Sequence, residues 1–62
     1  MTNLEALVSM SQTILRIRGE WCSNPKFGND VRDVVADVWT MMRVEDDTIM
    51  QDAIAELERR AP

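Results

Sequence analysis

A chain of 62 residues has room for one small domain, predicted here over residues 1–62. A domain of this size buries only about 60% of the surface that its unfolded chain exposes, and it usually gains stability from disulfides, metals or oligomerisation. The single cysteine, Cys22, and the absence of histidine exclude an intramolecular disulfide and argue against a thiolate zinc site, so oligomerisation remains. The net charge of −4, from 7 basic and 11 acidic residues, argues against a nucleic-acid binder and against an anionic membrane surface.

The first predicted helix covers residues 3–21. Thr2 with Glu5 three residues later matches a capping box, which is a signal for the start of a helix. At about 100° per residue, the apolar side chains of this segment gather on one side. They are Leu4, Leu7, Val8, Met10, Ile14, Leu15, Ile17 and Trp21.

The apolar arc of this helix is about 180° wide, whereas about 100° is enough for one core contact. One half of the arc contains Leu4, Val8 and Leu15, and the other half contains Met10, Ile14, Ile17 and Trp21. Ser11 and Arg18 project between the two halves. Two apolar faces on one helix predict two contacts, one with the core of the same chain and one with a second chain.

The second predicted helix covers residues 31–43 and follows a loop. Pro25 suits the second position of a turn, and Gly28 can adopt a positive φ at the end of the loop. Asp30 is then the predicted N-cap of the helix. The apolar positions follow the helical spacing and fail the alternation of a strand. They are Val31, Val34, Val35, Val38, Trp39 and Met42.

The third predicted helix covers residues 47–60. Asp46 or Asp47 can cap its start, and Thr48 with Gln51 offers a rival capping box. Its apolar face contains Ile49, Met50, Ala53, Ile54 and Leu57. Glu56 and Arg60 have the spacing of a stabilising ion pair. The second and third helices are expected to be separate, with one bent helix as the alternative.

No group of residues in the chain predicts catalysis. A nucleophile needs a base beside it, and histidine is absent. Cys22 near Arg18 or Lys26 is either a reactive thiol or, in the favoured interpretation, a small apolar residue at a helix end. The acidic run at residues 45–47 lacks the ligand spacing and the glycine of a calcium loop. The sequence therefore predicts no enzyme, no cofactor and no metal site.

Seven residues are candidates for binding a protein partner: Met10, Ile14, Ile17, Arg18, Trp21, Phe27 and Met41. Met10 and Met41 lie at the edges of their apolar stripes, so each belongs either to the core edge or to an interface. Phe27 either plugs one end of the bundle or stands with Trp21 as an exposed anchor. Arg18 either lies across apolar surface or pairs with an acid.

The sequence thus predicts an all-α domain of three short helices that forms a homodimer. A lone thiol without a signal-like segment or a long apolar run favours the cytoplasm. The predicted function is protein–protein interaction, as a regulator or inhibitor of a larger protein, by analogy with many bacteriophage-encoded inhibitors. The alternative is a dimeric DNA-binding regulator in which residues 31–60 form a helix-turn-helix, although the exposed face of the last helix is acidic.

Overall fold

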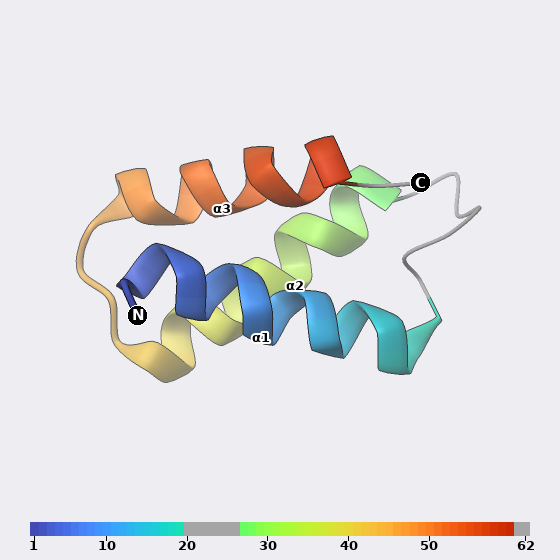
Figure 1. Ribbon diagram of the computed structural model, residues 1–62, viewed down its shortest axis with the longest axis horizontal. Coiled ribbons are helices and arrows are strands. Elements are labelled where there is room, and N and C mark those ends of the chain that lie inside the picture. The colour runs from blue at the N-terminus through green and yellow to red at the C-terminus, as the bar shows by residue number, and fades with distance from the viewer. Residues whose placement is uncertain (20–26, 61–62) are drawn as a thin grey trace.

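The computed structural model describes residues 1–19 and 27–60, and in these ranges every regular element is a helix. The helices are α1 (Asn3–Arg18), α2 (Phe27–Met42) and α3 (Asp47–Arg60). α1 and α3 lie side by side and run in the same direction, while α2 runs back across both and packs against each (Figure 1). The predicted all-α fold of three helices is confirmed for this part of the chain.

The start of α1 is capped as predicted, but its predicted end is wrong. The Oγ1 atom of Thr2 accepts a hydrogen bond from the backbone N–H of Glu5 at 3.1 Å. The helix ends at Arg18 rather than at residue 21, because Gly19 adopts a left-handed conformation with φ of 71°. The backbone N–H of Gly19 donates to the carbonyl oxygen of Arg16 at 3.2 Å, and glycine adopts this cap without steric cost. Trp21 is therefore not part of α1, and its position lies outside the described residues.

The predicted start of the second helix at residue 31 is also wrong, because α2 begins one turn earlier, at Phe27. Gly28 and Asn29 are weak helix formers, so the sequence signal begins only at Val31. The first turn of a helix has few intrahelical bonds, so propensity counts for less there. Asp30 is not the N-cap but an acidic residue of the first turn, where its charge favours the positive end of the helix dipole.

α2 and α3 are separate helices, as expected, and the break between them is a Schellman motif. Arg43 has a positive φ of 54°, and its backbone N–H donates to the carbonyl oxygen of Thr40 at 3.1 Å. The N–H of the buried Val44 donates to the carbonyl oxygen of Trp39 at 3.4 Å. The Oδ1 atom of Asp46 then accepts from the N–H of Thr48 at 2.9 Å, which confirms Asp46 as the cap of α3.

We expect Arg43→Gly to stabilise the fold by about 1 kcal/mol, because a left-handed conformation costs a residue with a Cβ about 1–2 kcal/mol and glycine almost none. Arg43 is exposed, so the substitution removes no buried contact. For a domain of this size, the melting temperature should rise by about 4–8 °C. Thermal unfolding followed by circular dichroism measures the change, and Arg32→Gly, an exposed arginine inside α2, is the control that should lower it. An unchanged or lower melting temperature for Arg43→Gly would contradict this account of the turn.

The core lies where the three helices meet, and the predicted apolar faces of α2 and α3 supply most of it. Its buried side chains are Leu7, Val8, Leu15, Val31, Val34, Val35, Val38, Ala53, Ile54 and Leu57. Trp39 and Met42 are half-buried and pack against it, as do Ile49 and Met50. Ser11 is buried in this core as well, and its Oγ atom has no hydrogen-bond partner within the described residues. Since unpaired buried polar groups cost free energy, this fold is stabilised chiefly by apolar packing.

Candidate protein-binding surfaces

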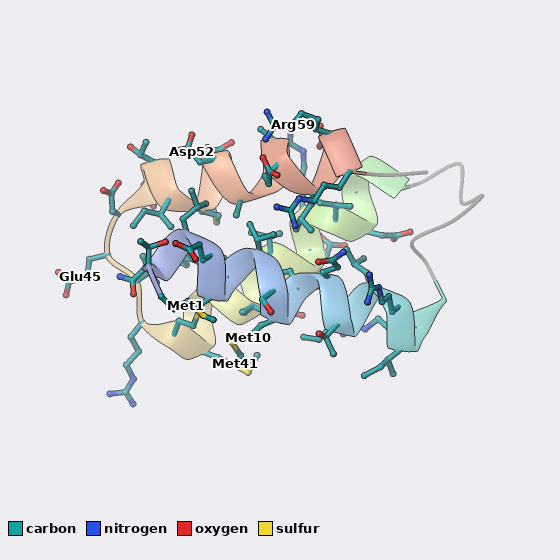
Figure 2. The ribbon with its side chains drawn as sticks, viewed as in Figure 1. Met1, Met10, Met41, Glu45, Asp52 and Arg59 are labelled. Atoms are coloured by element: carbon teal, nitrogen blue, oxygen red, sulfur yellow. The ribbon has the colours of Figure 1, made fainter. Side chains whose placement is uncertain are left out.

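Among the described residues, α1 and α2 together leave an apolar surface outside the core. It is formed by Met10, Ile14, Ile17 and Met41, and we call it the α1–α2 strip. Met10, Ile17 and Met41 are 43%, 79% and 62% exposed, while Ile14 is half-buried against the core. Figure 2 shows Met10 and Met41, from two different helices, projecting toward the same edge of the molecule. The structure thus separates Met10 and Ile17 from the buried Val8 and Leu15, as the two faces of the first helix predict.

Arg18 flanks the C-terminal end of the strip. Arg16 and Arg18 both lie in the last turn of α1 and are exposed. Arg18 follows Ile14 by four residues, so the two share one face of the helix. The arrangement leaves both predicted roles of Arg18 open, since its aliphatic stem can lie across the strip or its guanidinium can pair with an acid of another chain.

We expect Arg18→Met to weaken association of the strip with its partner about two- to fivefold while leaving the melting temperature of the dissociated chain unchanged, since exposed ion pairs contribute about 0.2–1 kcal/mol. Methionine keeps the apolar stem and removes only the charge. Arg16→Met, two residues earlier and on the other side of α1, is the matched control. Analytical ultracentrifugation measures the change, and equal association of Arg18→Met and the parent would mean that Arg18 makes no ion pair.

The side chains of two predicted partner residues, Trp21 and Phe27, fall outside the described part of the chain. Trp21 lies outside the described residues, and so does Cys22. Phe27 is the first residue of α2 rather than a loop residue, which overturns the predicted loop position, and its side chain also lies outside the described part. The choice between plug and exposed anchor for Phe27 therefore remains a prediction.

A second surface, which the sequence did not predict, is an open groove of about 640 Å³ between α1 and α3. We call it the α1–α3 groove. Its apolar lining residues are Met1, Leu4, Val8 and Ala55, and the polar side chains of Ser9 and Gln12 line it from α1. At about 100° per residue, the groove residues of α1 and the strip residues of α1 fall on opposite sides of that helix. The domain therefore presents two surfaces that different molecules can cover at the same time.

The α1–α3 groove is acidic at one end and basic at the other. Glu5 and Asp52 line the end near the start of α1, and Arg59 and Arg60 line the end near the C-terminus of α3. Figure 2 shows Asp52 and Met1 toward one end of the domain and Arg59 well along α3 from them. Opposite charges at the two ends give the groove a direction that a bound molecule can match.

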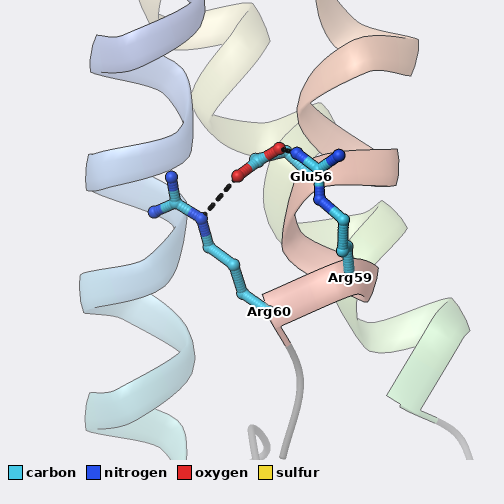
Figure 3. Close-up of polar contacts among 3 residues, drawn as sticks. All are labelled: Glu56, Arg59 and Arg60. Carbon is cyan, nitrogen blue, oxygen red and sulfur yellow. Dashed lines mark hydrogen bonds and ion pairs between the residues drawn. The ribbon is translucent and has the colours of Figure 1, made fainter.

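The basic end is held in place by Glu56, which also lines the groove (Figure 3). The Nε atom of Arg60 donates to Oε1 of Glu56 at 2.7 Å, which confirms the predicted ion pair, and Arg59 pairs with Oε2 of the same carboxylate. The Glu56 side chain is only 23% exposed, whereas that of Arg59 is 75% exposed. One carboxylate cannot neutralise two guanidinium groups, so the described lining of this end carries a net positive charge.

Neither surface has the residues of a metal site. Among the described residues, no three side chains of histidine, cysteine, aspartate or glutamate gather in a metal-binding arrangement. None of the described helices has the length and apolar composition that are needed to cross a lipid bilayer. Comparison with protein-family models, curated proteins and solved structures finds no match to this chain. The functional argument therefore depends on the two surfaces alone.

Proposed function

We propose that this chain is a non-catalytic protein–protein interaction module that regulates or inhibits a larger protein, and that it acts as a homodimer. The observation that carries the proposal is the exposed α1–α2 strip. Among the described residues, most other large apolar side chains pack in one core, whereas Ile17 and Met41 are mostly exposed and Met10 is 43% exposed. Exposed apolar patches of this kind mark protein-binding surfaces.

The spacing within the strip suits pairing with a second copy. Met10 and Ile17 are seven residues apart, or about 10 Å along α1, with Thr13 and Ile14 midway between them. In an antiparallel, two-fold pairing about that midpoint, Met10 of each copy meets Ile17 of the other. The two Arg18 side chains then lie at opposite ends of the contact, whereas a parallel pairing brings these like charges together.

The size of a stable interface indicates what else must take part. A standard interface covers about 800 Å² on each partner, which is about a fifth of the 4132 Å² surface of this chain. The strip supplies the apolar centre of such a contact, and the exposed polar residues of α1 and α2 around it supply the rim. Binding of a larger protein then uses surfaces that dimerisation leaves open.

Affinity purification of the full chain from its source cell, followed by mass spectrometry, tests the function. We expect one larger protein to be captured in stoichiometric amount by the parent chain. The captured protein should then bind the purified parent directly, with a change in its own activity that shows regulation or inhibition. Absence of any such protein, together with a salt-sensitive shift of duplex DNA, would instead favour the DNA-binding alternative.

A further inference from the structure

We infer that the α1–α3 groove binds an amphipathic helix of the partner protein and thereby completes a four-helix arrangement. This inference rests on the proposed function and names the part of the partner that the module recognises. The strip and the groove lie on opposite sides of α1, so a dimer formed through the strip leaves the groove open.

The shape of the groove suits a helix. α1 and α3 lie side by side and run in the same direction (Figure 1), and the groove follows the seam between them. Amphipathic helices commonly bind by laying their apolar face into a groove of this kind. Ser9 and Ala55, one on each side, are small, and small side chains let a third helix approach closely. Met1 and the half-buried Leu4 then face the apolar side chains of the bound helix.

The charges at the two ends specify which helix fits. The acidic end, with Glu5 and Asp52, favours basic side chains on the ligand, and the basic end, with Arg59 and Arg60, favours acidic ones. The expected ligand is therefore a helix with lysine or arginine toward one end and glutamate or aspartate toward the other. A uniformly anionic ligand such as nucleic acid or a phospholipid surface would be repelled by the acidic end.

A second copy of this chain fits the groove less well than a partner does. Among the described residues, the exposed large apolar side chains outside the groove are those of the strip, on the other side of α1. A strip bound in a groove is a head-to-tail contact, and such contacts continue into open assemblies unless the rotation closes a ring. Self-binding in the groove would therefore appear as growth beyond a dimer.

The experiment titrates the isotope-labelled full chain with synthetic helical peptides and follows backbone amide signals by NMR. The probe is a peptide of about 16 residues, about 24 Å as a helix, with leucines along one face, lysines in one half and glutamates in the other. Two matched peptides keep the leucines but carry only lysines or only glutamates. We expect the bipolar peptide to bind at least about tenfold more tightly than either, with shifts centred on Glu5, Ser9 and Ala55.

Two variants of the chain make the assignment specific. Ala55→Arg places a long charged side chain on the groove surface and should weaken binding of the bipolar peptide about tenfold or more. Thr40→Arg, at an exposed position of α2, which supplies no residue to the groove lining, is the matched control and should change binding less than about twofold. Arg59→Glu combined with Arg60→Glu makes both ends acidic, so the lysine-only peptide should become the preferred ligand.

Equal affinity of the three peptides, shifts centred on the strip, or full binding by Ala55→Arg would overturn the groove assignment. A further contradicting result is that the parent chain sediments as a species larger than a dimer and that Ala55→Arg removes this species. The molecule bound in the groove would then be a second copy of the chain. These outcomes would not contradict the proposed function, because the proposed function is tested separately by the direct binding and regulation of the captured protein. If no larger protein binds but the bipolar peptide does, the groove assignment stands and the proposed function fails.

Discussion

Val35→Glu should unfold the chain at neutral pH. Val35 is fully buried in the middle of α2, and the core around it contains no basic side chain. Burial raises the pKa of an introduced carboxyl group by up to about 3–5 units. At a pH above the pKa values of the folded and unfolded states, each unit of this difference lowers the free energy of unfolding by about 1.36 kcal/mol. The resulting cost of roughly 4–7 kcal/mol is comparable to the whole stability of a 62-residue domain, roughly 3–9 kcal/mol.

The pH dependence of this variant has a definite sign. A carboxyl group whose pKa is higher in the folded state binds its proton more tightly there, so the folded state is favoured where the group is protonated. Relative to the parent, Val35→Glu should therefore be least destabilised near pH 4 and progressively more so as the pH rises to 7. Circular dichroism melts at several pH values measure this difference.

Thr40→Glu is the control for the loss of a small side chain and the gain of a charge on α2. Thr40 is exposed, and its hydroxyl donates only to the carbonyl oxygen of Ala36 within the same helix. A negative charge in the last turn of a helix costs up to about 1 kcal/mol, so the control should lose no more stability than that relative to the parent. A cooperative melt of Val35→Glu at the temperature of the parent would mean that α2 does not supply the core.

The buried face of α2 is the part of the fold that the sequence predicts best. Four valines lower helix propensity, yet their spacing at Val31, Val34, Val35 and Val38 fits only a helix with one buried side. All four are fully buried, and the half-buried Trp39 and Met42 extend the same face. Periodicity succeeds here because burial of one continuous face is what stabilises a short helix.

Helix ends were harder to predict, because they depend on single residues with unusual backbone conformations. The apolar spacing of the first helix continues to Trp21, but the left-handed Gly19 ends the helix at Arg18. The glycine itself was the available signal, since glycine is common just past the end of a helix. At Arg43 no such signal exists, because arginine rarely adopts a positive φ.

The α1–α3 groove could not be derived from the sequence, because it depends on how two helices pack. Glu5, Ser9 and Gln12 carry the pattern of an ordinary solvent-exposed face, and only the position of α3 beside them turns that face into one wall of a groove. Ala55 in the exposed part of α3 was the one hint, since a small apolar residue there leaves room for another helix. The strip, in contrast, followed from the width of the apolar arc on one helix.

Ile17→Glu should abolish self-association while leaving the three-helix fold intact, which is the opposite of the result expected for Val35→Glu. Ile17 is 79% exposed, so the carboxylate remains in water in the dissociated chain and its melting temperature should hardly change. In the proposed pairing it would be buried against Met10 of the second copy. Loss of a central interface residue costs about 2 kcal/mol or more.

The effect on the dimer is doubled, because a two-fold interface contains each substitution twice. The expected loss is therefore about 4 kcal/mol, or roughly 1,000-fold in the dissociation constant. Sedimentation velocity over a range of micromolar concentrations measures it against the parent. Gln51→Glu, an exposed position on α3 away from the strip, adds the same charge and should dimerise like the parent.

The antiparallel geometry predicts a further result, which a general loss of apolar surface would not produce. If Met10 of each copy meets Ile17 of the other, the double variant Met10→Lys/Ile17→Glu brings opposite charges together at both ends of the contact. It should associate more tightly than either single variant, and added salt should reduce that gain because these charges lie near the surface. In a parallel pairing each substituted position meets its own copy, so like charges collide twice and the double variant should be the weakest of the three. A parent chain that sediments as a monomer and still unfolds cooperatively would remove the basis for the pairing altogether.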